Sequence, residues 1–578
     1  MGSCAKLDAP RGASRRQVIL LLLLSVALCS PTLAHQISPD AARLAAAQKA
    51  FDSAHWEEAA ALAQGPANQS PDLDFLRGLA LARQQQWNEA RQAFVSAHLK
   101  NPSDPRFLVE LAGVDYKQNN FPAAKRSLRA ALRLGSRDNY TRDFLGTIYF
   151  LEGNLEAALK YWNAIDKPRL RTVALQPPPH LDTTLLTRAV GFNAPQVLTA
   201  EAWLSAQARL ENLGVFSHER LELKPEGETF DATVHVAERN AWGDSKLEGA
   251  LALLSGVPYA TVYPELYNIG GRAMNFTSLL RWDPEKRRAF GAFSTPAFDN
   301  PARRVQIYFD ARNENWNLTN TFFGGGVPLS DMNMRRVAGG LELHSVVNGR
   351  WSWSTGTEIA SRSFRNLSGL NSTAEKIFFT DANSFSFWLR ADRSLWRVPE
   401  RRFTLDSSAE GRIARTFAGN LGASGTVRGS LDAHWLPRAT GDDYEMRARL
   451  RAGATLGRVP FDDLFQLGLE RDNDLWLRGH AGTTGGRKGA APLGRRYFLA
   501  NWEMDKNVYS NGLFTVKFGP FLDNGAIADS SGLFGSRQWQ WDTGAQCKVR
   551  ILGSITVVLI YGRDLRGGRN VFYGTVLR

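Results

Sequence analysis

The sequence is poor in cysteine, and it contains no long apolar run beyond its N-terminal region. Only three of its 578 residues are cysteines, and two of them, Cys4 and Cys29, come before Ala34, which leaves Cys547 alone. A lone cysteine cannot form an internal disulfide, and no cysteine cluster has metal-ligand spacing. The sequence also lacks a G-x-S-x-G elbow, a P-loop and an H-E-x-x-H motif. We therefore expect no enzyme activity, no cofactor and no metal centre.

The N-terminal region has the three parts of a secretory signal peptide. Arg15 and Arg16 precede an apolar run from Val18 to about Leu28, and small residues then end at Ala34. The run is too short to cross a bilayer, which takes about 20 apolar residues. We therefore assign residues 1–34 to a signal that is cleaved on export, and the fold prediction starts after them.

The net charge of +13 does not by itself select a partner. It is compatible with acidic partners or with the phosphates of an outer-membrane lipid. Nucleic acid fits poorly with export, and no helix or finger motif for binding it is present, so we expect no nucleic-acid partner.

Residues 41–166 repeat with a period of 34 residues. The positions that carry this period are Gly78, Ala112 and Gly146, then Ala90, Ala124 and Ala158, then Phe94, Leu128 and Trp162. A period of about 34 residues with small residues at fixed places is typical of tetratricopeptide repeats, each of which is a helix pair. Small side chains let two helices approach, and large ones fill the gap to the next pair. The concave face of such a stack commonly binds peptides, so we expect a periplasmic partner there; a spacer without a ligand is the alternative.

Residues 169–240 predict a small α/β module with the order strand, helix, helix, strand, strand. Asp182 and Thr199 are expected to cap the helices, and Gly214 to end the second one. This order, together with residues 210–216, resembles a POTRA domain, the periplasmic module of BamA-like outer-membrane insertases and two-partner secretion transporters. The resemblance implies that an exposed strand edge receives unfolded polypeptide by strand addition; a mechanical linker is the alternative. We place that edge at Thr233, Val234, His235 and Val236.

Residues 256–578 alternate between apolar and polar side chains in short segments separated by polar or glycine-rich turns. Ile307 and Phe309, for example, share one face of their segment, opposite Tyr308 and Asp310. Aromatic residues such as Trp351 and Trp476 are abundant, as the girdles at a membrane interface require. We predict a transmembrane antiparallel β-barrel of about sixteen strands. A soluble sandwich or propeller shows the same alternation, but the export signal favours the barrel.

Two motifs in this region resemble those of the BamA-like superfamily. Residues 477–480 are similar to the V-R-G-F/Y tip of its long sixth extracellular loop, and residues 521–525 to its F-x-D-x-G strand motif. The resemblance implies that the loop folds back into the lumen and that its arginine pairs with the strand aspartate. The alternation agrees, because Phe521 and Asp523 share the parity of the polar Lys517. The predicted lumen latch consists of Arg478, Gly479, His480, Phe521, Asp523 and Gly525.

The sequence also departs from the family pattern. His480 replaces the expected aromatic residue, and the chain ends without a terminal phenylalanine. Only one POTRA-like module is evident, which argues against the housekeeping insertase. Acidic pairs such as Asp462 and Asp463, or Asp472 and Asp474, are interpreted as loop or turn residues.

Three functions remain open at this point. The first is insertion of barrel proteins into the outer membrane of a Gram-negative bacterium. The second is movement of one secreted protein through the lumen of the barrel. The third is export of a polysaccharide or other polymer, since known exporters also join tetratricopeptide repeats to a barrel; the POTRA-like module and the latch motifs argue against it. An orphan barrel that binds only a structural partner is also compatible with the sequence. In each case, residues 35 to about 250 are expected to lie in the periplasm.

Overall fold

The structure is a computed structural model of the chain. It describes residues 39–577 apart from short gaps, and the predicted signal peptide lies outside the described residues. The gaps are residues 67–68, 136–137, 240–252, 254, 324–328, 419–420, 439–440, 442, 512, 537 and 552–554.

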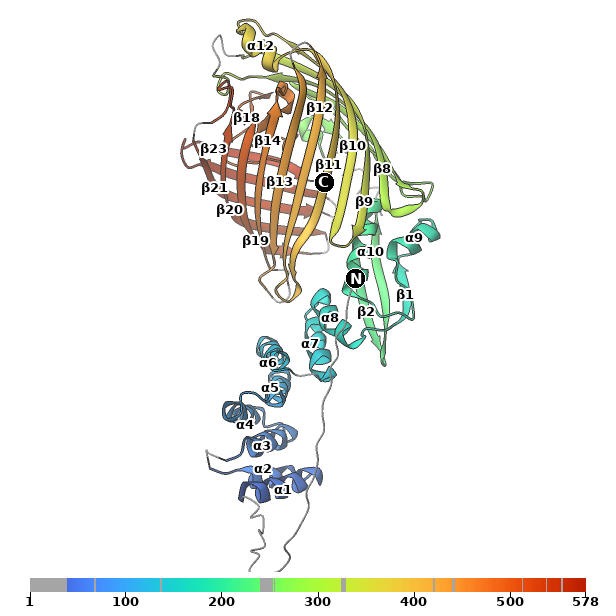
Figure 1. The fold of residues 1–578 in the computed structure, drawn as a ribbon, viewed down its shortest axis with the longest axis vertical. Coiled ribbons are helices and arrows are strands. Elements are labelled where there is room, and N and C mark those ends of the chain that lie inside the picture. The colour runs from blue at the N-terminus through green and yellow to red at the C-terminus, as the bar shows by residue number, and fades with distance from the viewer. Residues whose placement is uncertain are drawn as a thin grey trace, which may run out of the picture. The chain divides into compact units, whose positions relative to one another are not determined.

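The chain folds into two compact units that divide after Leu134. Helix pairs make up the described part of the first unit, and Figure 1 labels them from α1 onwards. They are α1 (Pro39–Asp52), α2 (Trp56–Ala63), α3 (Pro71–Arg83), α4 (Trp87–Lys100), α5 (Pro105–Lys117) and α6 (Phe121–Arg133). A fourth pair, α7 (Asn139–Leu151) and α8 (Leu155–Trp162), belongs to the second unit.

The ends of these helices follow the same 34-residue period as their packing. Side chains of Ser70, Asp104 and Asp138 accept hydrogen bonds from the backbone N–H two residues later and so cap α3, α5 and α7. Such caps stabilise a helix by about 1 kcal/mol. The turn inside each of these pairs has one residue with a left-handed backbone: Gln85, Asn119 and Gly153. Each repeat is therefore specified by its caps and turn as well as by its core.

The predicted packing positions are all buried, and the small ones face the large ones. A Cβ added to Gly78 would lie 2.6 Å from the ring of Phe94, and one added to Gly146 would lie 2.5 Å from the ring of Trp162. Both distances are too short for a real contact. The glycines are therefore required because the aromatic ring of the second helix packs directly against the backbone of the first.

The α/β module has the predicted element order, but its sheet order corrects one prediction. The elements are β1 (Leu170–Gln176), α9 (Thr183–Val190), α10 (Ala200–Leu213), β2 (Phe216–Glu226) and β3 (Thr229–Glu238). β3 lies in the centre, with β1 parallel on one side and β2 antiparallel on the other. The predicted strand-addition edge at Thr233, Val234, His235 and Val236 is wrong, because both sides of β3 already pair. The edges of this sheet are β1 and β2.

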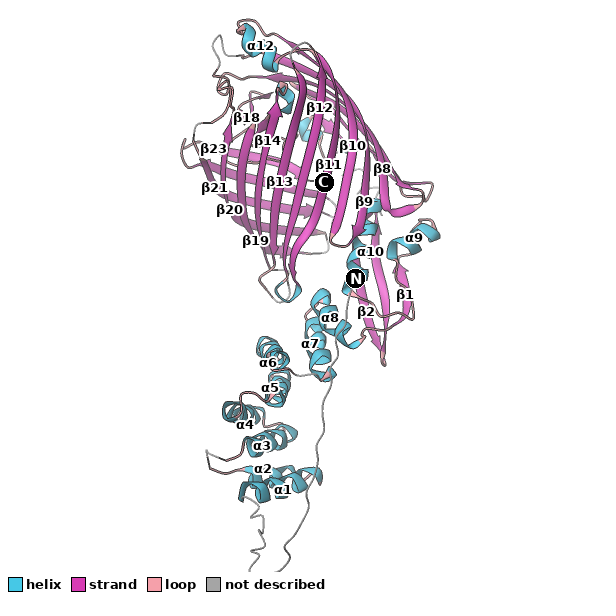
Figure 2. Ribbon diagram, viewed as in Figure 1, coloured by secondary structure: helices cyan, strands magenta, loops and turns pink. Residues whose placement is uncertain are grey.

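The remaining strands form one large barrel, drawn in magenta in Figure 2. Its wall consists of β4 (Thr261–Val262), β5 (Glu265–Ile269), β6 (Met274–Trp282), β7 (Lys286–Ala297), β8 (Asn300–Trp316), β9 (Met332–Asn348), β10 (Trp351–Arg365), β11 (Ala382–Val398), β12 (Phe403–Phe417), β13 (Gly422–Trp435), β14 (Tyr444–Gly457), β19 (Arg496–Ser510), β20 (Phe514–Ala528), β21 (Gln540–Ile551), β22 (Ile555–Asp564) and β23 (Asn570–Leu577). A short helix, α12 (Ser372–Phe378), lies in the connection between β10 and β11.

The large sheet agrees with the predicted antiparallel barrel of about sixteen strands. The sheet order contains 18 strands, and setting aside β16 (Thr483–Thr484) and β17 (Arg487–Lys488), which lie between β14 and β19, leaves 18 − 2 = 16 wall segments. β4 and β5 both pair with β6, however, so they share one position. The order returns from β23 to β4, as in a closed barrel.

The outer face of the barrel is apolar and the inner face is charged. Ile307 and Phe309 on β8 are 59% and 50% exposed, whereas Asp310, the residue after Phe309, is 5% exposed. Large exposed side chains recur around the wall at Leu341, Ile359, Phe387, Ile413, Val427, Leu450, Phe518, Leu522 and Leu559. An apolar belt outside and buried charges inside are the reverse of a soluble sandwich, and they make this a membrane barrel. Among the described helices, none has the length and apolar character of a membrane-spanning helix.

The fourth helix pair contacts the α/β module and a turn of the barrel. It lies in the second compact unit, because the units divide after Leu134. Leu159 belongs to the core of the α/β module, where the Trp162 ring lies 5.4 Å from that of Phe230. Asn154 donates to the carbonyl of Pro399 at 2.8 Å, in the turn η3 (Pro399–Arg401) between β11 and β12.

Ion pairs reinforce this junction. Glu156 accepts two hydrogen bonds from Arg397, at 2.9 and 2.8 Å. Lys160 and Tyr161 both donate to Glu400, at 2.5 and 3.0 Å. Burial alone would raise the pKa of the Glu400 carboxyl, but the hydrogen bond from Lys160 holds that pKa below its usual value. The last helix pair is thus fixed to the barrel and to the α/β module together.

Candidate functional site

The connection from β14 to β19, residues 458–495, folds into the barrel; we call it the inward segment. Its apolar side chains Leu467, Leu475 and Leu477 pack in one buried cluster with wall residues such as Tyr497 and Ile527. Asn473 gives the segment its shape, because its side-chain amide donates to the carbonyls of Gln466 and Gly468 at 2.9 Å each. The segment therefore has a core and internal hydrogen bonds of its own inside the barrel.

Arg478 ties the inward segment to the late strands of the barrel. It donates to Asp523 on β20 from its backbone N and its Nε, each at 2.9 Å, and from Nη2 at 2.7 Å. Nη1 donates to Glu503 and Gln546 at 2.8 Å each, and the guanidinium carbon lies 3.9 Å from the centre of the Phe521 ring. Arg478 is 4% exposed and Asp523 is fully buried. The guanidinium therefore binds Asp523 through Nε and Nη2, binds Glu503 and Gln546 through Nη1, and packs its face against the Phe521 ring.

The two glycines of the latch permit close approach. A Cβ at Gly479 would lie 2.6 Å from the carboxyl carbon of Asp542, and its backbone N–H donates to that carboxylate. A Cβ at Gly525 would lie 3.2 Å from Leu467 of the inward segment. Gly562 on the wall strand β22 is required for the same reason, because a Cβ there would overlap the carbonyl of Arg478. The six latch residues, Arg478, Gly479, His480, Phe521, Asp523 and Gly525, are thus brought together at one place.

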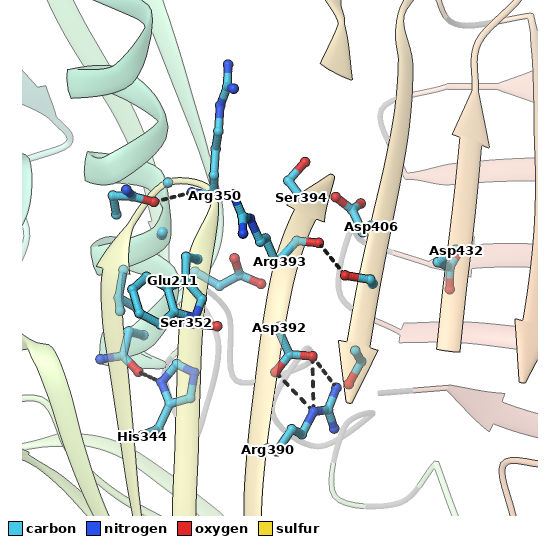
Figure 3. A pocket seen from close by; sticks show the side chains of 18 of the residues that line it. Glu211, His344, Arg350, Ser352, Arg390, Asp392, Arg393, Ser394, Asp406 and Asp432 are labelled. Carbon is cyan, nitrogen blue, oxygen red and sulfur yellow. Dashed lines mark hydrogen bonds and ion pairs between the residues drawn. The ribbon is translucent and has the colours of Figure 1, made fainter. Parts of the chain in front are cut away.

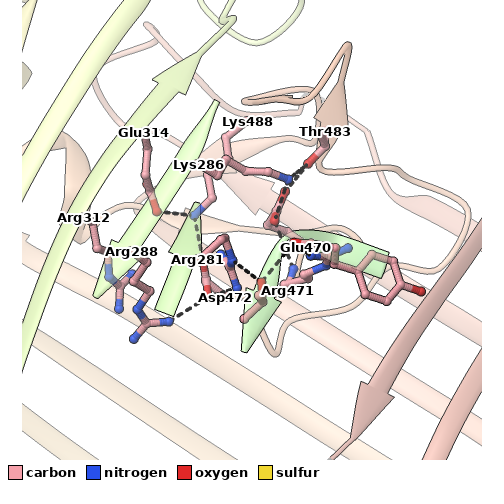
Figure 4. A network of polar contacts seen from close by, with 12 residues as sticks. Arg281, Lys286, Arg288, Arg312, Glu314, Glu470, Arg471, Asp472, Thr483 and Lys488 are labelled. Carbon is pink, nitrogen blue, oxygen red and sulfur yellow. Dashed lines mark hydrogen bonds and ion pairs between the residues drawn. The ribbon is translucent and has the colours of Figure 1, made fainter. Parts of the chain in front are cut away.

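A second set of charges ties the inward segment to the early strands (Figure 4). Asp472 accepts from Arg281 on β6 at 2.8 Å and from Arg288 on β7 at 2.7 Å. Lys488 donates to Glu314 on β8 at 2.7 Å, and Glu470 lies 3.4 Å from Lys286. All of these side chains except Arg288, which is 15% exposed, are nearly buried. The early and late strands are therefore held by the same segment.

Two further contacts reach the strands on either side of the closure. The Arg471 guanidinium lies 3.6 Å from the centre of the Tyr259 ring, just before β4, and donates to the Tyr259 carbonyl at 3.2 Å. The Trp476 ring lies 6.3 Å from that of Tyr573 on β23. The interpretation of Trp476 as a girdle residue is therefore wrong, because it belongs to the inward segment. The segment contacts both sides of the seam between β23 and β4.

The acidic residues Asp462 and Asp472 lie in turns, as predicted. In addition, both are buried ion-pair partners. Asp462 lies 3.0 Å from Arg362 and 3.2 Å from Arg336, and its side chain is 4% exposed. No local motif marks such residues, since each partner is distant in sequence. The sequence feature that could have indicated these pairs is alternation, which places the partner arginines Arg336 and Arg362 on the lumen face of their strands.

A polar cavity of about 560 Å³ lies where the α/β module meets the barrel (Figure 3). α10 contributes Glu211 and Asn212 to its lining, and Asn212 contacts His344 of β9 at 2.7 Å. On β11, Arg390 pairs with Asp392 at about 3 Å. Serine side chains from β10 to β13 complete a lining that alternates in charge. Such a lining offers both donors and acceptors to an extended polar chain.

The fold and the site together define a class of protein: a membrane β-barrel with a segment locked inside its lumen and an α/β module at one end. No family model and no curated protein matches the chain. Similar solved structures are BamA from Haemophilus ducreyi lacking POTRA domains 1–3 (12% identity, 71% of this chain and 85% of that one, TM-score 0.42) and CdiB from Escherichia coli (13%, 71%, 75%, 0.44). MamA is similar over 20% of this chain and 70% of its own (15%, 0.19). BamA and CdiB are thus structural neighbours of this chain.

Proposed function

We propose that this chain is a Gram-negative outer-membrane protein that inserts polypeptides into that membrane or moves them across it, with a periplasmic arm that receives them. The observation that carries the proposal is the inward segment, which Arg478 fixes to β20 and Asp472 fixes to β6 and β7. A passive pore has no need to hold early and late strands through one internal segment. A barrel that changes the contact between those strands does.

The apolar outer face supports the membrane location, and the secretory signal predicted for residues 1–34 supports export. Outer membranes are where such barrels occur, so the repeats and the α/β module, up to about residue 250, would lie in the periplasm. The barrel's outer belt contacts membrane lipid, and the concave face of the repeats is available to a periplasmic partner.

The α/β module supports a polypeptide as the substrate. Of its two outer strands, β1 is already covered at its first residue, where Leu170 N–H donates to the Gln196 carbonyl at 2.8 Å. β2 is the longer outer strand, and its His218, Arg220 and Glu222 are exposed. An extended chain added at β2 would gain backbone hydrogen bonds without regard to its sequence. The serine-rich cavity beside α10 lies next to this module and suits the same extended chain.

The seam supports insertion in particular. In the sheet order β23 is followed by β4 and β5, which are only 2 and 5 residues long, whereas the next wall strands β6 and β7 have 9 and 12 residues. A client strand could therefore pair with β23 at a low cost in broken hydrogen bonds. Passage through the lumen would first need the inward segment to leave, and with it both sets of ion pairs.

A photo-crosslinking amino acid at Glu222 of the full-length protein in intact cells tests the proposal. We expect crosslinks to nascent outer-membrane or secreted polypeptides. The matched control is Glu228, an exposed residue in the turn between β2 and β3. Capture of a glycan, or equal capture of the same polypeptides from Glu222 and Glu228, would contradict it; a glycan would favour the exporter of the repeat-plus-barrel type.

A further inference from the structure

Three aspartates stand side by side on the inner face of the late strands. Asp523 on β20 is directly opposite Asp542 on β21, and Asp542 is directly opposite Asp564 on β22. They are 0%, 0% and 5% exposed. Like charges directly opposite each other destabilise a sheet, and burial adds the cost of lost hydration. This row therefore needs compensating positive charge.

The compensation is complete only at one end of the row. Arg478 neutralises Asp523. Among the described residues, no lysine or arginine side chain forms an ion pair with Asp542 or Asp564. The basic side chain that faces both of them is His480. One oxygen of the fully buried Asp542, Oδ1, has no hydrogen-bond partner among the described residues. Two carboxylates thus share one imidazole.

The imidazole is oriented as a metal ligand would be. Its Nδ1 lies 3.1 Å from Asp542 Oδ2, which places the proton on Nδ1 and leaves Nε2 with its lone pair. Nε2 faces Asp564 Oδ2 at 3.7 Å. That separation is too long for a hydrogen bond. It suits two ligands of one ion, because bonds of about 2.0–2.2 Å place neighbouring ligand atoms roughly 3.3–3.7 Å apart.

We propose that His480 Nε2 and Asp564 bind a divalent transition-metal ion, with zinc as the representative, and that Asp542 orients the imidazole by accepting the hydrogen bond from Nδ1. The candidate ligand atoms of the three side chains all lie within 4.8 Å of one another. A ligand set of one imidazole nitrogen and one carboxylate suits Zn²⁺ better than Mg²⁺, which favours oxygen ligands and retains water. The ion would join the tip of the inward segment to β22, beside the Arg478 pair, while Asp542 on β21 holds the imidazole in place. The site gives the histidine at position 480 a role that an aromatic residue could not fill.

The experiment is zinc titration of the full-length protein in detergent after treatment with a chelator, by calorimetry and by elemental analysis. We expect one equivalent of Zn²⁺ with no comparable uptake of Mg²⁺. His480→Phe and Asp564→Asn should weaken zinc binding by about 100-fold or more, and Asp542→Asn by about 10–100-fold. His434→Phe is the matched control, because His434 also faces a carboxylate, Glu445 at 3.0 Å, but only one. Zinc binding by this variant should equal wild type.

A second readout does not depend on the variants. In the wild-type protein, zinc should slow tryptic cleavage of the inward segment, and chelation should restore the faster rate. The proposal is overturned if His480→Phe binds zinc as wild type does, or if wild type takes up no zinc. It is also overturned if protection follows acidification without metal, since His480 would then bridge the carboxylates as an imidazolium.

Discussion

Replacing Arg478 by alanine is the sharpest perturbation that the structure offers. The substitution removes two side-chain hydrogen bonds to Asp523 and those to Glu503 and Gln546, and it leaves a fully buried carboxylate with only backbone and amide partners. Removing one partner of a buried pair costs about 3–5 kcal/mol. We expect the population with a released inward segment to rise roughly 100- to 4,000-fold, at about 1.4 kcal/mol per tenfold.

Proteolysis measures this population directly, because cleavage of a transiently open state follows the opening equilibrium when reclosing is fast. Trypsin should cut the inward segment of Arg478→Ala faster by that factor, with the wall intact. Arg569→Ala is the matched control, since Arg569 is exposed and forms no ion pair among the described residues. A rate within about threefold of wild type would refute the reasoning, because it would mean that the buried pair contributes less than 1 kcal/mol.

Exchanging the charges, Arg478→Asp with Asp523→Arg, should not restore protection, because an aspartate at 478 would face Glu503; a rate near wild type would contradict this. Gly78→Leu should destabilise the repeats by about 1–3 kcal/mol in thermal melts through its clash with Phe94, whereas Gly113→Ala, with nothing within 4 Å, should stabilise them by about 0.5–1 kcal/mol. Burial raises the pKa of the Glu219 carboxyl from 4.5 to about 7. Hydrogen-exchange protection of the α/β module should therefore fall as pH rises from 4.5 to 7, and Glu219→Gln should remove that slope; equal slopes would contradict the assignment.

The repeats and the barrel wall were predictable because each rests on a short-range period. A spacing of 34 residues is enough to identify Gly78 and Phe94 as packing positions of one helix pair, and the alternation around Asp310 identifies the lumen face. Alternation also placed Phe521 and Asp523 on that face. These patterns are local, and they follow from helix and strand geometry alone.

Pairings between distant segments were not predictable in the same way. Alternation in β3 does not reveal that β1 pairs parallel with it, so the sequence predicts an edge at a strand that is central in the sheet. Asp472 and Lys488 have no local motif, because their partners on β6 to β8 are more than a hundred residues away. Only the family motif around Arg478 carried information across that distance. The row formed by Asp523, Asp542 and Asp564 depends on strand register, which single residues do not encode.

We propose that the chain handles polypeptides at a barrel whose inward segment controls the contact between early and late strands. The most direct test of this proposal places the full-length protein in phosphatidylcholine vesicles with an unfolded outer-membrane barrel chain, and follows how fast that chain becomes folded or protease-protected. We predict that the wild-type protein and Arg569→Ala accelerate the step over empty vesicles, and that Arg478→Ala, which loses its hold on Asp523, does so at a clearly different rate. Equal rates with empty vesicles, wild type and Arg478→Ala would contradict the account.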